Sequence, residues 1–155
     1  LRSAFFSARQ SVADKAKAIE AHLSREVSRA LGVGCKDGCF IPYVQMHEFE
    51  ALLFSNPRVL AECVDPGNRK LKDDLLAIRD HCHGPEKIDD GASSAPSKRL
   101  LALLPSYDKR SLGPVVVQRI GLPAIREQCP HFDDWIKKLE ALGTKSTGGS
   151  RRKRK

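Results

Sequence analysis

Several features that would point directly to a function are absent from this sequence. No apolar run approaches the roughly 20 residues that a membrane-spanning helix needs, and no secretory signal is present. The chain has no P-loop, no G-x-G-x-x-G and no G-x-S-x-G motif. A nucleotide site or an acyl-transfer site therefore cannot be argued from motif. The chain also contains no internal repeat.

The number of cysteines is odd, and basic charge is unevenly distributed. The five cysteines are an odd number in a chain without a secretory signal, which indicates reduced thiols in a cytoplasmic protein. The net charge is +8; the run Arg151 to Lys155 supplies five of it and Lys145 a sixth, which leaves +2 for residues 1–144. The basic character therefore belongs mostly to the end of the chain.

The low-complexity composition after residue 143 predicts a folded part over 1–143 and a disordered polybasic tail over 144–155. Such a tail attracts nucleic acid by counterion release, and Arg151, Arg152 and Lys153 are its candidate contacts. The alternative is a solvated end without a partner. At 155 residues, the chain is long enough for one domain with its own core. Because the first residue is Leu1, we expect a piece of a longer protein.

The hydrophobic pattern is mainly that of helices. Caps, prolines and glycines delimit the expected helices at 11–31, 57–64, 69–83, 96–105, 112–120, 122–128 and 132–142. The residues from Cys39 to Met46 instead are rich in β-formers and predict a short buried strand. A lone buried strand cannot pair its own backbone groups, so it needs partners that the sequence does not show. We therefore expect a mainly α-helical chain with one or two strands, whose full protein has an α/β fold.

A polar box follows the expected strand. His47, Glu48 and Glu50 stand where the pattern changes from strand to helix, with Phe49, Leu52 and Leu53 expected on the apolar face of that helix. Ligands of open α/β sheets usually bind at the carboxyl edge of the strands, so these three residues are candidate catalytic groups. The alternative is that His47 caps the turn and the two acids complement the positive end of the helix.

Two kinds of metal site are conceivable. A zinc-protease H-E-x-x-H motif is rejected, because its second histidine position is Ala51. Mg²⁺ prefers carboxylates and water, and its candidate ligands are Glu48, Glu50, Asp89 and Asp90. Four residues are of the right type for a zinc site: Cys35, Cys39, His81 and His83. Their spacing is loose, so zinc is the less favoured metal.

Basic residues also stand at the start of the helix that Pro96 opens. Lys98 and Arg99 follow Ser97 there, and helix N-termini bind phosphate through backbone N–H groups. Both residues are candidate nucleic-acid contacts. The alternative is an ordinary exposed first turn.

Three stretches together resemble one bacterial family. They are residues 40–55 (FIPYVQMHEFEALLFS), the loop 86–91 (EKIDDG) with 95–100 (APSKRL), and 121–135 (GLPAIREQCPHFDDW). This pattern is similar to the domain-of-unknown-function family 4276, a TOPRIM-like group related to RloB-type proteins. The resemblance covers most of residues 40–142.

The resemblance implies a TOPRIM-like α/β domain that works beside an ABC-type or OLD-like ATPase in defence against foreign DNA. TOPRIM nucleases hold Mg²⁺ with an early glutamate and a later pair of aspartates. Those residues should lie before Leu1, so this chain resembles the C-terminal portion of the family. Carried over to matched positions, the resemblance places His47, Glu48 and Glu50 at the border of the metal or phosphate site, followed by Asp89, Asp90, Lys98 and Arg99.

Three hypotheses about function follow. The first is the C-terminal part of a Mg²⁺-dependent, nuclease-type partner of an ATPase. The second is a non-catalytic interaction module that docks the ATPase and in which the box is structural. The third is a nucleic-acid-binding fragment that depends on its tail. The first two differ in whether Glu48 and Glu50 point into a cleft or make helix-cap and salt-bridge contacts.

Overall fold

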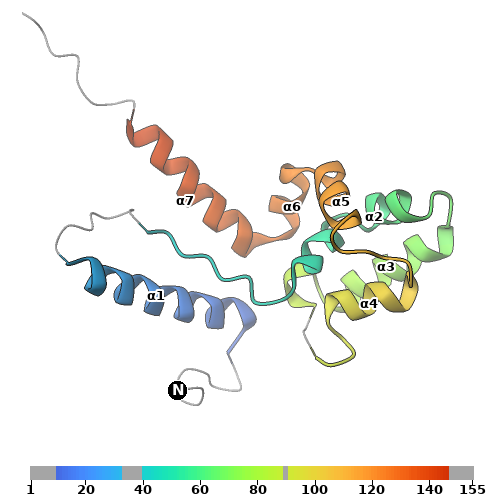
Figure 1. Cartoon of the computed structure of the whole chain (residues 1–155), viewed down its shortest axis with the longest axis horizontal. Helices are drawn as coiled ribbons and strands as arrows, with labels where there is room; N and C mark the ends of the chain where they lie inside the picture. Colours follow the sequence, from blue (N-terminus) through green and yellow to red (C-terminus); the bar gives the residue numbers. More distant parts are fainter. Residues whose placement is uncertain (1–9, 33–39, 89–90, 147–155) are drawn as a thin grey trace, which may run out of the picture.

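The architecture of the chain is seen in a computed structural model, which describes residues 10–32, 40–88 and 91–146. Over these residues the chain is mainly helical, as predicted (Figure 1). The elements in chain order are α1 (Val12–Leu31), η2 (Phe49–Ser55), α2 (Pro57–Val64), α3 (Arg69–His81), η3 (Pro85–Lys87), α4 (Pro96–Leu103), α5 (Leu112–Ile120), α6 (Leu122–Gln128) and α7 (Pro130–Ser146).

The helix boundaries follow from local chemistry. The Ser11 hydroxyl accepts a hydrogen bond from the Asp14 backbone N–H at 3.1 Å and so caps α1. The Asn56 side chain caps α2 by accepting from the Val59 N–H at 3.2 Å, with Pro57 at the first helical position. These starts are where the sequence predicted them.

The core lies among α2 to α6, with η2 at its centre. The 3₁₀ helix η2 touches each of α2, α3, α4, α5 and α6 as well as η3. Its Leu53 and Phe54 are fully buried, and they join one apolar cluster: Leu53, Phe54, Leu60, Ala61, Leu71, Leu75, Ile88, Leu100, Leu104, Tyr107, Val116, Ile120, Ile125 and Cys129. The short segment after residue 48 is therefore the element around which the helices assemble.

The remaining elements form an arm beside this core. Figure 1 shows α1, the extended residues 40–46 and α7 running side by side away from the other helices. Glu20 of α1 accepts a hydrogen bond from the Val44 N–H at 2.8 Å. On the other side, the Tyr43 ring stacks on Trp135 of α7, with ring centroids 4.9 Å apart. The extended residues thus lie between two helices.

The expected strand at Cys39–Met46 was wrong for the part of the chain that the structure describes, which contains no strand. Residues 40–46 are extended but have no neighbouring strand with which to exchange backbone hydrogen bonds. Side chains take over part of that role, because the Trp135 indole N–H donates to the Ile41 carbonyl at 3.3 Å and Glu20 accepts from Val44. Cys39 lies outside the described residues.

The apolar face expected after Glu48 was right for Leu53, which is in the core, and for Leu52, which packs against it, but wrong for Phe49. The element is a 3₁₀ helix, in which residues three apart align. It buries Glu50, Ala51, Leu53, Phe54 and Ser55, whereas Phe49 remains 37% exposed.

Three helices have bounds that differ from expectation by two residues or more. Helix α4 ends at Leu103 rather than at Pro105, and α7 begins at Pro130 rather than at Phe132. Helix α3 ends at His81 rather than His83, which has a positive φ of 58°. Helix α7 continues to Ser146, three residues into the segment predicted as tail.

Candidate functional site

The polar box of His47, Glu48 and Glu50 lies at the junction between the extended arm and the core. His47 lies at a bend, and Glu48 has an extended backbone (φ −63°, ψ 156°) that begins η2. Glu50 follows in the first turn of η2. The three side chains, although close in sequence, have different surroundings.

Glu48 caps helix α4, which belongs to the core. Its Oε2 atom accepts a hydrogen bond from the Ser97 backbone N–H at 2.7 Å. Pro96 has no N–H, so Ser97 offers the first donor of that helix. Burial disfavours the charged carboxylate, but the hydrogen bonds from Ser97 and the charges of Lys109 and Lys98 outweigh it, so the pKa of Glu48 lies below its ordinary value.

Glu50 is a buried carboxylate with one ionic partner. Its side chain is 1% exposed, and its Oε2 atom lies 2.9 Å from the Nζ atom of Lys109. Lys109 comes from the loop between α4 and α5, and its side chain is 56% exposed. The other carboxylate oxygen has no hydrogen-bond partner among the described residues. Glu50 therefore depends on Lys109 for its compensation.

Tyr107 belongs to the same neighbourhood. Its side chain is buried, and its hydroxyl has no hydrogen-bond partner in the described part of the chain. Burial, followed by the charge of Glu50, raises the pKa of Tyr107 to about 12. The phenol is therefore neutral at physiological pH.

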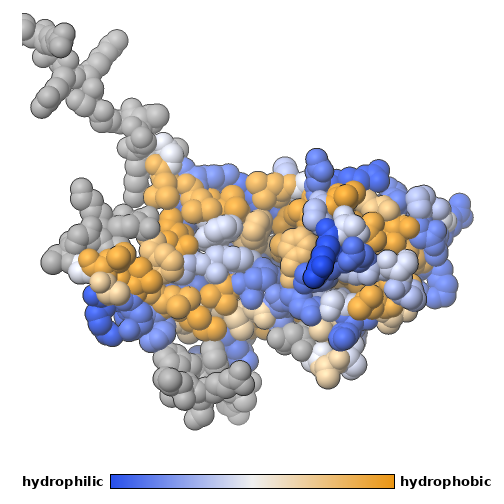
Figure 2. All heavy atoms as spheres, in the orientation of Figure 1, coloured by the Kyte–Doolittle hydropathy of each residue, from blue (hydrophilic) through white to orange (hydrophobic). Residues whose placement is uncertain are grey.

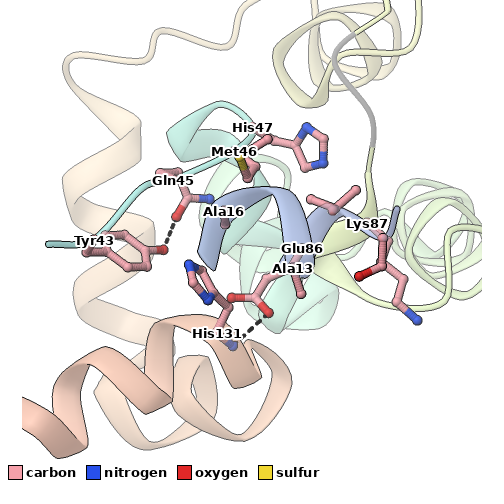
Figure 3. A pocket seen from close by; sticks show the side chains of 11 residues that line it. Ala13, Ala16, Tyr43, Gln45, Met46, His47, Glu86, Lys87 and His131 are labelled. Atoms are coloured by element: carbon pink, nitrogen blue, oxygen red, sulfur yellow. Dashed lines mark hydrogen bonds between the residues drawn. The ribbon is translucent and has the colours of Figure 1, made fainter. Parts of the chain in front are cut away.

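His47 lines a cavity on the opposite side of the junction, between the arm and the core (Figure 3). The cavity has a volume of about 410 Å³. Four segments build it: the start of α1, residues 43–47, η3 and the start of α7. His47 therefore faces other groups than Glu48 and Glu50 do.

Glu86 and His131 hold this cavity together. Both carboxylate oxygens of Glu86 accept backbone N–H groups at the start of α7, from His131 at 3.0 Å and from Phe132 at 2.9 Å. The His131 Nε2 atom lies 2.9 Å from Glu20 of α1, and its ring stacks on Tyr43 with centroids 5.3 Å apart. One histidine thus links α1, the extended residues and α7.

Several predicted site residues lie outside the described ranges: Asp89, Asp90, Arg151, Arg152, Lys153, Cys35 and Cys39. The described residues contain no group of three His, Cys, Asp or Glu side chains arranged to hold a metal ion. His81 and His83 are exposed at the end of α3. The proposed magnesium and zinc sites therefore stay predictions.

The two basic candidates on α4 differ from each other. Lys98 is exposed and close enough to Glu48 to lower the pKa of that carboxyl. Arg99 is half-buried, and its Nε donates to the Ser94 carbonyl at 2.7 Å, which closes the turn before the helix. Of the two, only Lys98 extends into solvent.

Sequence reasoning missed the residues that complete the site from a distance. Lys109 meets Glu50 across 59 positions, and Glu86 meets His131 across 45. Glu20 and Tyr107 were likewise not expected. The one available signal was the polar Glu20 within the apolar stripe of α1, since a charged residue there needs a partner.

These observations define a mainly helical protein in which an H-E-x-E box joins an extended arm to a helical core. None of the described helices is long and apolar enough to cross a membrane. A family model described as domain of unknown function (DUF4276) matches residues 3–140. The chain therefore belongs to this family, as its three sequence stretches indicated. No curated protein and no solved structure matches it.

Proposed function

We propose that this chain is an interaction module of a TOPRIM-like protein, in which the box of His47, Glu48 and Glu50 organises the fold. The observation that supports this is the engagement of both acids. Glu48 caps α4 through Ser97, and Glu50 is paired with Lys109 in the core. Helix-cap and salt-bridge contacts are what a structural box makes, whereas a metal-binding pair would present its oxygens to a cleft.

The partner we propose is an ABC-type or OLD-like ATPase, in a bacterial system that acts on foreign DNA. Exposed leucines on the arm support a docking role: Leu23, Leu31, Leu139 and Leu142 are between 37% and 61% exposed. Figure 2 shows apolar residues over both α1 and α7 on the face in view. Apolar surface of this kind marks interaction sites when it is contiguous.

The proposal keeps Mg²⁺-dependent nuclease-type chemistry for the protein as a whole and assigns it to carboxylates other than Glu48 and Glu50. The test uses the protein expressed from its complete gene, with and without the ATPase. Cleavage of plasmid and RNA in Mg²⁺ is compared between the wild type and a Glu48→Gln, Glu50→Gln double variant. Glu62→Gln is the matched control, because Glu62 is exposed on α2.

We expect the double variant to cleave in proportion to its folded fraction, measured by circular dichroism. Loss of cleavage in a fully folded double variant would place the box in the active site and overturn the proposal. Docking is tested separately with Leu139→Asp and Leu142→Asp, which should abolish co-purification with the ATPase. Leu101→Asp is the control, since Leu101 is equally exposed but lies on α4.

A further inference from the structure

The cavity beside His47 is lined by both apolar and polar side chains. The first turns of α1 and the end of the extended segment supply the apolar side chains of Val12, Ala13, Ala16 and Met46. Gln45, Glu86 and His131 add polar groups to the same lining (Figure 3). At about 410 Å³, the cavity falls in the range of about 300–1,000 Å³ that is typical of small-molecule sites.

The polar side chains offer hydrogen bonds that the protein itself does not use. The Nδ1 atom of His131 is buried and has no hydrogen-bond partner within the described ranges. The Gln45 carbonyl oxygen accepts from the Tyr43 hydroxyl, and Figure 3 shows its amide nitrogen directed away from Tyr43. Each carboxylate oxygen of Glu86 accepts one backbone N–H and keeps a second lone pair. The lining thus presents both donors and acceptors.

Aromatic rings adjoin these polar atoms. His131 and Tyr43 line the cavity and stack on each other with an interplanar angle of 26°. Tyr43 also stacks on Trp135, so the rings are held in place from behind. A ligand that fills this space meets two aromatic side chains, small alanine side chains and hydrogen-bonding atoms.

We infer that this cavity binds a nucleobase, which combines a planar aromatic body with donors and acceptors along its edge. Proteins recognise unstacked bases by packing them on Tyr or His rings and by hydrogen-bonding their edges. A purely apolar ligand would leave the buried Nδ1 atom unpaired. The base has two sources: a free nucleoside or nucleotide, or an unstacked base of a single-stranded nucleic acid.

A second cavity lies next to the first one. This second cavity of about 360 Å³ shares Glu86, Lys87 and His131 with the first and adds Lys17 and His83. Lys17 and Lys87 are both exposed cations at the rim. Three carboxylates line this cavity as well, Glu86, Glu127 and Asp134, so its charge is mixed and gives no preference to a phosphate.

The test titrates the full chain with adenosine, guanosine and a single-stranded oligo-dA, with ribose as the control without a base. Binding is measured by calorimetry, and contact by NMR shifts of the His131 ring and the Gln45 amide. We expect saturable binding with a Kd below about 1 mM and shifts at both side chains. Tighter binding of the oligonucleotide would assign the site to nucleic acid, and tighter binding of the nucleosides to a free ligand.

Two variants make the test specific. Ala13→Leu fills the cavity from an exposed helix position and should weaken binding at least tenfold, as should Gln45→Met. Ala30→Leu is the matched control on the same helix, because Ala30 is exposed and does not line the cavity. The inference is overturned if no probe binds at millimolar concentration, or if Ala13→Leu and Gln45→Met, both folded, bind as the wild type does.

Discussion

Replacing Lys109 with methionine leaves a buried carboxylate without its ionic partner. Glu50 is 1% exposed, whereas Lys109 is 56% exposed, so the two partners have unequal access to water. Breaking a fully buried pair costs about 3–5 kcal/mol. Because the Lys109 ammonium is partly solvated and screened, we expect Lys109→Met to lower the free energy of unfolding by about 2 kcal/mol.

Replacing Glu50 instead of Lys109 should lower the free energy of unfolding by less. In Glu50→Gln, Lys109 can return to water, and the amide keeps the volume of the carboxylate; the loss should be about 1 kcal/mol. Urea unfolding of both single variants and the double variant gives the two costs and their coupling. Lys70→Met is the control, because the Lys70–Asp74 pair is exposed and should contribute less than about 0.5 kcal/mol.

The difference between these two stability losses tests whether Glu50 depends on Lys109. A Lys109→Met variant that is no less stable than Glu50→Gln would mean that Glu50 does not need Lys109. In that case water or another group compensates the carboxylate, and the structural role assigned to the box would be wrong.

Three further predictions concern other contacts of the site. Glu86→Ala removes both side-chain hydrogen bonds at the start of α7 and should lower stability by about 1–2 kcal/mol in urea unfolding; an unchanged midpoint would contradict the cap. The pKa of Glu48 is lowered in the folded protein, so its stabilisation is fully present above its ordinary value of 4.5 and is lost as the pH falls through the lower folded pKa; Glu48→Gln should therefore flatten the acid side of the stability curve. Burial raises the pKa of Cys129 to about 12, so alkylation of the native protein, followed by mass spectrometry, should leave Cys129 unmodified until denaturant is added.

Most of the helices could be predicted because the residues that start and end a helix lie within a few positions of its ends. Ser11 with Asp14, and Asn56 with Pro57, fix helix starts within four residues of sequence. The strand failed for the opposite reason: β-formers at residues 40–46 favour an extended backbone, but a strand exists only when a neighbour pairs with it. The 3₁₀ geometry of η2 changed which residues were buried, so that Glu50 rather than Phe49 faces the core.

The site was only partly predictable. The box residues were recognisable from their sequence, but Lys109, Glu86 and His131 reach it over separations of 45 residues or more. Such contacts depend on how helices pack, and no periodicity reveals them. The position of His47 on a cavity separate from Glu48 and Glu50 likewise follows from the bend between arm and core.

The attachment of α1 has a consequence for how the protein opens. One side chain of α1, Glu20, links the helix to both Val44 and His131. Beyond Leu23 the helix is largely exposed. Amide protons of α1 should therefore exchange with deuterium through a local opening, while those of η2 and α2 exchange only on global unfolding. The arm and the core are then two units of different protection within one chain.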